Sequence, residues 1–192
     1  MKRYLTFPSA LAAFALLTLL TGCTSPNPAL YTIAVQPGPA VAGGPKIIVL
    51  RDIGLAGYLD RPGIVRASDG YRLEVMSNDT WGEPLGAMIG RVLAVELAQR
   101  LPGSNVYGER GVISPNPDAT VAVNIQRMDI DSSGNLELLA QAEIEFSHRK
   151  DTPAKTFQIS KPVASVTTPD EVAAISAAIS ELADGVAHML RP

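Results

Sequence analysis

Apolar residues recur at two periods along this chain, and each period predicts a different kind of secondary structure. Alternating apolar residues, or compact apolar runs bounded by turn residues, are typical of β-strands. Apolar residues three and four positions apart are typical of amphipathic helices. The runs of strand type cover residues 31–35, 46–50, 64–67, 71–75, 119–130, 136–146 and 155–163.

Two longer stretches carry the helical period. Residues 84–101 place apolar side chains on one broad face, begin with a proline and end before Pro102-Gly103. Residues 169–190 form the second predicted helix, and Thr168-Pro169-Asp170-Glu171 at its start has the pattern of a capping box. The small residues expected on the outward side of the second helix are Ser176, Ala177, Ser180, Ala183 and Ala187.

Turn residues connect the predicted strands. Asp69-Gly70 between two apolar runs favours a tight hairpin, because both central residues of that turn need positive φ. Residues 131–135 connect the next pair of strands, whereas residues 37–45 and 104–117 lack periodicity and are expected to be irregular. Together these elements predict an α+β fold, with two long helices packed on one face of a largely antiparallel β-sheet.

The amino terminus has the anatomy of an export signal. Two basic residues precede an apolar run over residues 5–20, and small residues follow it. The run is shorter and more interrupted than the ~20 apolar residues that a membrane-spanning helix needs. We therefore expect residues 1–22 to be a signal peptide, residues 23–30 a tether and residues 31–192 a single α+β domain.

Cys23 is the only cysteine in the chain and directly follows the predicted signal peptide. Leu20-Thr21-Gly22-Cys23 resembles the lipobox of bacterial lipoproteins. That resemblance implies diacylglycerol transfer to the Cys23 sulfur, cleavage between Gly22 and Cys23, and acylation of the new amino terminus. The alternative is an ordinary apolar residue near a normal cleavage site, but a lone thiol in an oxidising compartment is reactive, and a thioether removes that reactivity.

The charge of the mature chain bounds its partners. Without residues 1–22, 14 Lys and Arg stand against 19 Asp and Glu, a formal net charge of −5. Such a surface argues against nucleic acid and against electrostatic attachment to anionic lipid. Membrane attachment would then depend on acyl chains, each buried CH₂ group contributing about 0.8 kcal/mol. Residues 24–30 reach roughly 23 Å at most, so the domain is expected close to its membrane.

The residue types that catalysis and metal binding require are scattered through the sequence. The histidines lack zinc-type spacing, and the carboxylate pairs have strand spacing, which predicts a solvent-facing position. No serine lies in a nucleophile elbow. We therefore predict no enzyme, no metal and no cofactor apart from the covalent lipid, and a cell-envelope hydrolase is the disfavoured alternative. The residues considered are His148 and His188, Asp129 with Asp131, and Glu143 with Glu145.

Two short stretches combine aromatic, charged and proline residues in a way that permits two interpretations. One is structural, a rigid turn together with a ring that packs at the start of the first helix. The other is a partner-binding surface, since Trp and Arg are enriched in the hot spots of interfaces. The sequence leaves both open. The residues concerned are Tyr58, Leu59, Asp60, Arg61, Pro62 and Ile64 in the first stretch and Trp81 in the second.

These motifs occur in one order along the chain, and in that order they resemble the PqiC-type lipoproteins. That family comprises auxiliary components of ABC-type transport systems that work with MCE proteins. The likeness covers nearly the whole mature chain, and the connector over residues 37–45 departs from the family pattern. The motifs are the lipobox, Tyr31-Thr32-Ile33, Tyr58-Leu59-Asp60-Arg61-Pro62 with Ile64-Val65, and Trp81-x-Glu83-Pro84-Leu85 before an amphipathic helix.

The resemblance implies a periplasm-facing lipoprotein that docks a tunnel-forming MCE protein of the inner membrane, so that lipids or other apolar molecules cross the periplasm. It also implies a subunit without catalysis and, by analogy with ring-shaped MCE assemblies, a homo-oligomeric ring. Thr24 and Ser25 lack the Asp that resembles an inner-membrane retention signal, which favours the outer membrane. The alternative function is a periplasmic lipid- or ligand-binding lipoprotein with a pocket between helices and sheet.

Overall fold

The computed structural model describes residues 27–67 and 71–191. The signal peptide, Gly22, Cys23 and the Asp69-Gly70 pair lie outside the described residues. The fold is α+β, as the apolar pattern predicts. The elements are β1 (Ala29–Tyr31), β2 (Ile47–Leu50), β3 (Gly54–Leu55), β4 (Gly63–Ala67), β5 (Leu73–Trp81), α2 (Leu85–Arg100), β6 (Asn105–Gly108), β7 (Ala119–Ile130), β8 (Asn135–Phe146), β9 (Ala154–Pro162) and α3 (Thr168–Met189).

The larger sheet is antiparallel in one half and parallel in the other. β7 pairs antiparallel with β8, and β8 with β9, as the predicted hairpin pattern requires. On the other side of β7, β2 pairs parallel with both β6 and β7, and the short β3 also pairs parallel with β7. The strand β6 lies at the start of the stretch over residues 104–117, which was predicted to be irregular, so that prediction is wrong for residues 105–108.

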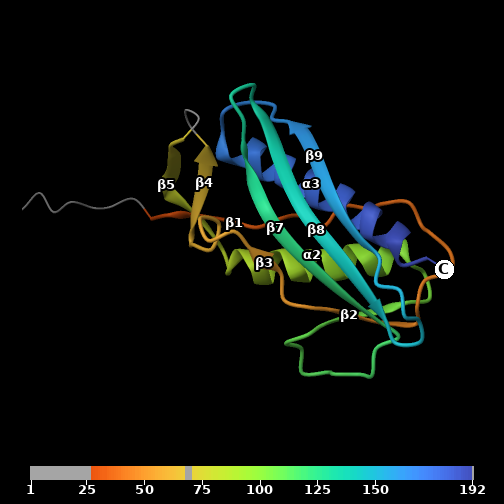
Figure 1. The fold of residues 1–192 in the computed structure, drawn as a ribbon. Helices are drawn as coiled ribbons and strands as arrows, with labels where there is room; N and C mark the ends of the chain where they lie inside the picture. Colours follow the sequence, from red (N-terminus) through yellow and green to blue (C-terminus); the bar gives the residue numbers. More distant parts are fainter. Residues whose placement is uncertain (1–26, 68–70, 192) are drawn as a thin grey trace, which may run out of the picture.

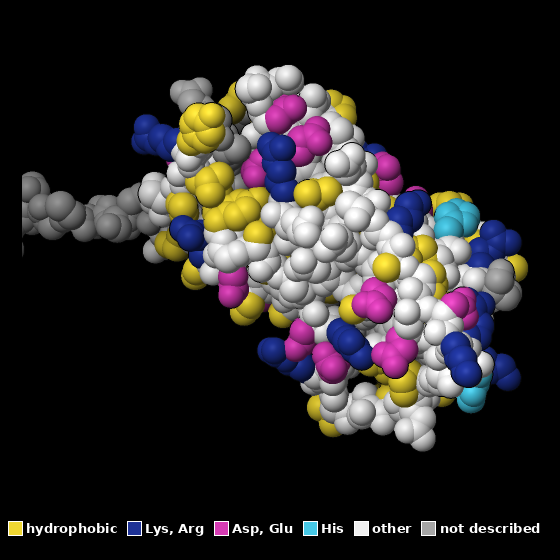
Figure 2. Space-filling view, in the orientation of Figure 1, with side chains coloured by type: hydrophobic (Ala, Val, Ile, Leu, Met, Phe, Trp, Pro, Cys, Tyr) yellow, Lys and Arg dark blue, Asp and Glu magenta, His cyan; other side chains and the backbone are white. Residues whose placement is uncertain are grey.

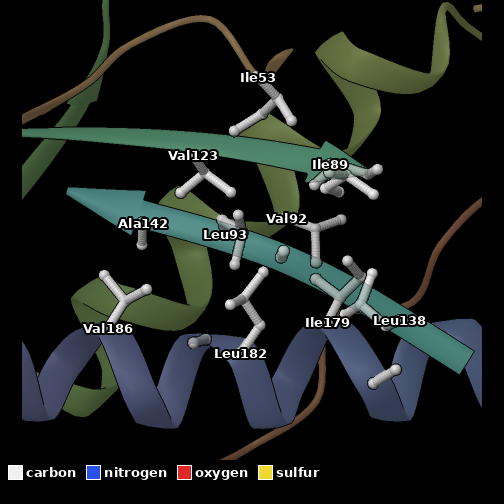
Figure 3. Packing of buried hydrophobic residues seen from close by; sticks show 14 of the residues in the cluster. Ile53, Ile89, Val92, Leu93, Val123, Leu138, Ala142, Ile179, Leu182 and Val186 are labelled. Carbon is white, nitrogen blue, oxygen red and sulfur yellow. The ribbon is translucent and has the colours of Figure 1, made fainter. Parts of the chain in front are cut away.

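The helices α2 and α3 lie side by side on one face of the larger sheet (Figure 1). Alternate side chains of β7 and β8 point toward them, as the period of a strand requires. In Figure 3, Val123 and Ala142 from the strands meet Leu93, Leu182 and Val186 from the helices. All five are at most 4% exposed. Side chains therefore fill the layer where the alternative function would need a ligand pocket.

A second, three-stranded sheet lies at one end of the molecule (Figure 1), although the sequence pattern predicts only one sheet. β4 and β5 pair antiparallel on either side of residues 68–70, with Val65 opposite Val75, which confirms the predicted pairing. The short strand β1 pairs parallel with the far end of β5. We call this three-stranded sheet the small sheet.

The predicted strand over residues 31–35 is wrong beyond its first residue, because β1 ends at Tyr31. The chain then leaves the small sheet and runs along the two helices. Here the backbone N–H groups donate to side chains of the helices instead of to a neighbouring strand. An alternating apolar pattern is the same in both cases, so it could not show that no strand forms here. The bonds run from the backbone N of Ile33 to Met88 Sδ (3.2 Å), of Ala34 to Ser176 Oγ (3.1 Å) and of Gln36 to Glu96 Oε1 (2.8 Å).

The start of α3 differs from the predicted capping box. The N-cap residue is Thr167, and its side chain makes no capping hydrogen bond. Glu171, which a capping box would turn back toward the N-cap, is 1% exposed and forms an ion pair with Arg66 of β4 at 2.7 Å. A tertiary ion pair therefore replaces the local cap and joins α3 to the small sheet.

The small residues of α3 point inward, which corrects their predicted outward position. Ser176, Ser180, Ala183 and Ala187 are all buried, and Ala177 is half-buried. Small side chains let the neighbouring helix approach, and Ser180 indeed hydrogen-bonds with Arg100 of α2. In the described part of the chain, α3 is long and apolar enough to cross a membrane, but 61% of its most apolar window is buried within the fold.

Candidate functional site

The stretch over residues 58–64 is a turn held between β3 and β4 by backbone hydrogen bonds. It starts where the Ala56 N–H donates to the Ile125 carbonyl of β7 at 2.9 Å. The Leu59 N–H then donates back to the Ala56 carbonyl at 2.8 Å, and the Arg61 N–H donates to the Leu59 carbonyl at 2.9 Å. These bonds close two successive turns and give this stretch the rigidity that the structural interpretation predicts.

Three of the predicted partner-binding side chains belong to the hydrophobic core. Leu59 is 3% exposed, Ile64 is fully buried and Trp81 is 7% exposed. The Trp81 N–H donates to the Pro62 carbonyl at 2.8 Å, so a backbone bond joins the two sequence motifs directly. These side chains hold the site together from inside, and a partner could reach little of them.

Tyr58 is half-buried and has a polar role. Its hydroxyl donates to the Asp129 carboxylate at 2.8 Å and accepts from the Met128 N–H at 3.1 Å. Burial, reinforced by the Asp129 carboxylate, raises the pKa of Tyr58 to about 12, so the hydroxyl keeps its proton as a donor. Asp129 was predicted to face solvent but is buried, because the side chains of Tyr58 and Arg127 bind its carboxylate and cover it.

Asp60, Arg61 and Pro62 are the exposed members of the predicted set. The Arg61 side chain forms no hydrogen bond or ion pair within the described residues, so its five donors are available to a partner. The three residues line one side of a cavity of about 370 Å³, whose other side is formed by Trp81, Glu83, Pro84 and Leu85. The structure thus brings the two motifs together around one concave surface, the motif cavity.

A larger groove of about 690 Å³ adjoins the motif cavity and shares Asp60 and Pro84 with it. It follows the outer face of α2 toward the loop after β6. Both apolar and charged side chains line it. The residues include the apolar or small Ile53, Leu55, Gly86, Gly90, Ala94 and Val95, and the charged Arg51, Asp52, Arg91, Glu109 and Arg110.

Glycines allow the chain to pass close to α2 in this groove. A Cβ added at Gly86 would lie 3.3 Å from the Ile53 carbonyl oxygen, and one at Gly90 would lie 3.5 Å from the Ile53 side chain. The groove is also braced by an ion pair of 2.6 Å between Arg91 and Glu83. Gly86 and Gly90 are four residues apart and therefore lie on one face of α2. That spacing was the one signal in the sequence that could have predicted the groove.

Comparison with known proteins now decides the family. The profile of the ABC-type transport auxiliary lipoprotein components matches residues 30–187. The chain belongs to that family. None of the curated proteins compared with the sequence matches it.

Solved structures support the fold of this auxiliary lipoprotein. The crystal structure of an uncharacterized protein superposes with a TM-score of 0.72 at 13% identity, covering 85% of this chain and 99% of that one. The crystal structure of a Xanthomonas campestris protein of the DUF330 family gives a TM-score of 0.69 at 19% identity, covering 84% of this chain and 94% of that one. At such identities the likeness concerns the fold alone.

The family of auxiliary lipoproteins is a transport family and not an enzyme family. His148 and His188 are both exposed, as are Glu143 and Glu145. Within the described residues, no group of three or more His, Cys, Asp and Glu side chains could hold a metal ion. The side chains that line the motif cavity can donate hydrogen bonds, form ion pairs and pack against apolar groups of a partner. These are the interactions of a binding site.

Replacing Tyr58 by Phe tests the structural part of the site. The change leaves the Met128 N–H and the Asp129 carboxylate each short of a partner in a half-buried position, so we expect a loss of about 1–3 kcal/mol in the free energy of unfolding. Urea denaturation measures it. Tyr107→Phe is the matched control, because the Tyr107 hydroxyl has no hydrogen-bond partner among the described residues. Equal stabilities of the two variants would contradict this role for Tyr58.

Proposed function

We propose that this protein is a membrane-anchored auxiliary lipoprotein of an MCE/ABC-type intermembrane lipid transport system, and that it docks the periplasm-spanning MCE protein at the outer membrane. Membership of the transport auxiliary family supports the general role. The partner and the membrane are our proposals, argued from the motif cavity and from the sequence around Cys23. A homo-oligomeric ring stays a prediction.

The proposed anchor is a lipid on Cys23, without any other cofactor. A lipoprotein family requires an acylated cysteine, and Cys23 is the only cysteine that the chain offers. Cleavage between Gly22 and Cys23 would leave this residue at the new amino terminus. Thr24 and Ser25 support the outer membrane as the destination, with the domain facing the periplasm.

The proposed docking surface is the motif cavity with the adjoining groove along α2. The observation that carries it is the position of Arg61, which is exposed, unpaired within the described residues and fixed by a turn whose neighbours are in the core. An Arg on a rigid turn at the edge of a concave surface suits an interface hot spot. Asp60 and Pro62 flank it, and the small residues of α2 leave room for a partner segment.

Arg61→Ala is expected to weaken binding of the MCE protein without weakening the fold. Truncation of a hot-spot Arg typically costs about 2 kcal/mol of binding free energy, roughly a thirtyfold rise in Kd. Pull-down with the MCE protein from the same genome, followed by a titration, measures the change. The matched control is Arg191→Ala, an exposed arginine beyond α3. A lower melting temperature with unchanged binding would show that Arg61 is structural and would remove this docking surface.

A further inference from the structure

The outward face of the small sheet is apolar. Residues directly opposite one another in paired strands share a face of their sheet. Leu30 lies opposite Thr80, Thr80 opposite Gly63, and Val75 opposite Val65. A Cβ added at Gly63 would lie 2.6 Å from Val75 Cγ1, which confirms that these positions share one face.

The other face of the small sheet is turned toward the rest of the protein. Ile64 is fully buried there, Arg66 binds Glu171 of α3, and Trp81 packs in the core. The apolar residues at alternate positions must therefore point outward. We call this face, with the adjacent Tyr71, the outer face.

The outer face exposes four large apolar side chains, whereas Val65 on the same face is buried. Leu30 is 70% exposed, Leu73 45% and Val75 43%, while Tyr71 beside them is fully exposed. These four make up half of the eight exposed large hydrophobic side chains in the described part of the chain. Figure 2 shows hydrophobic side chains gathered at the end of the molecule that carries β4 and β5. Several large apolar side chains exposed on one face mark a contact with a protein or a membrane.

The position of Cys23 decides between those partners. β1 begins at Ala29, six residues after Cys23, so the edge of the small sheet can lie no farther than roughly 20 Å from the lipid-bearing residue. A lipid on Cys23 would hold that residue at the bilayer surface. The outer face therefore lies within reach of the headgroup region, where tyrosine and aliphatic side chains are stabilised.

We propose that the outer face of the small sheet rests on the phospholipid surface to which Cys23 is tethered. The inference rests on the proposed lipidation of Cys23. Contact at Leu30, Leu73, Val75 and Tyr71 gives the domain a second attachment besides the acyl chains. Two attachments restrict the rotation of the domain on the membrane. Because the Trp81 N–H of the small sheet donates to the Pro62 carbonyl, the orientation of the sheet also fixes the direction in which the motif cavity faces.

Tryptophan placed on the outer face provides the test. The full-length lipidated Tyr71→Trp protein is reconstituted in vesicles of phosphatidylethanolamine and phosphatidylglycerol whose acyl chains are brominated, and its emission is compared with that in unbrominated vesicles. Bromine quenches only nearby indole rings. The parent protein, whose single Trp81 is 7% exposed, gives the background emission.

Val112→Trp is the matched control, because Val112 is fully exposed in the loop after β6, beyond the larger sheet. We expect several-fold more quenching at position 71 than at position 112. Should Tyr71→Trp melt at a lower temperature than the parent, Leu73→Trp reports on the same face. Equal quenching at the two ends of the molecule would overturn the inference. So would emission that depends on the protein-to-lipid ratio but not on bromine, since that result indicates contact with a second copy of the chain.

The intact mass of the purified protein separates this inference from the proposed function. A protein without lipid on Cys23 would refute the proposed anchor, whatever the fluorescence shows. A lipidated protein that stays with the vesicles but shows no bromine quenching at position 71 or 73 would refute only the contact of the outer face.

Discussion

Loss of the Cys23 thiol is expected to release this protein from the membrane fraction. With a mature charge of −5, the domain gains nothing from anionic lipid, so acyl chains must provide the attachment. At about 0.8 kcal/mol per buried CH₂ group, two or three chains bind essentially irreversibly. The outer face of the small sheet adds only a weak contact of its own, and a domain without acyl chains should partition into the soluble periplasmic fraction.

The experiment must also remove the signal peptide. Because a lipobox couples cleavage to lipid transfer, Cys23→Ser alone would leave the apolar run over residues 5–20 attached. The decisive variant therefore combines Cys23→Ser with the signal peptide of an ordinary secreted protein in place of residues 1–22. Fractionation followed by immunoblotting measures its distribution, and the unchanged protein is the control. A variant that folds but remains in the membrane pellet would contradict the anchor.

The sequence predicts the parts of this fold that depend on period alone. α2, α3 and the long strands β7 to β9 were expected, because each buries a regular apolar stripe, and the pairing of β4 with β5 was expected from the Asp69-Gly70 turn signal. The features that the sequence did not predict depend on contacts with residues far away in the chain. β6 is a short edge strand whose pairing with β2 has no local signal, and the amides after Tyr31 bind side chains of distant helices.

The candidate site was predicted only in part, because its remaining features also depend on tertiary contacts. The motifs pointed to the correct place, but composition could not separate the side chains that fix the turn from those that a partner can reach. Leu59, Ile64 and Trp81 are structural because all three are buried in the hydrophobic core. The groove along α2 was missed, since it depends on how residues 53–55 cross Gly86 and Gly90.

Arg100 is the other residue whose importance only the structure shows. It is a fully buried charge at the end of α2, and it forms an ion pair with Asp184 of α3. Its guanidinium also donates to the Ser180 carbonyl at 3.0 Å. A Cβ at Gly38 would come within 2.3 Å of the guanidinium, so the amino-terminal connector passes directly over it. Arg100 thus holds α2, α3 and the residues that follow the tether in one cluster.

Arg100→Met is expected to lower the free energy of unfolding by about 3 kcal/mol. Removing one partner of a buried ion pair costs about 3–5 kcal/mol, and the lower value applies because Asp184 is 35% exposed. Burial already raises the pKa of Glu96, whose Oε2 has no partner, and the loss of Arg100 removes the charge that offsets it. In a domain of this size the melting temperature should fall by roughly 6–12 °C.

Two further variants make the Arg100 result decisive. Arg149→Met, which removes an exposed ion pair with Asp151 and a contact of the guanidinium with the Phe146 ring, should change the stability by no more than about 1 kcal/mol. Glu96→Gln added to Arg100→Met removes the orphaned buried carboxylate, so the double variant should recover about 1 kcal/mol relative to additivity in urea denaturation. Strict additivity would show that the penalty comes from lost packing, and unchanged stability of Arg100→Met would show that the cluster does not hold the helices together.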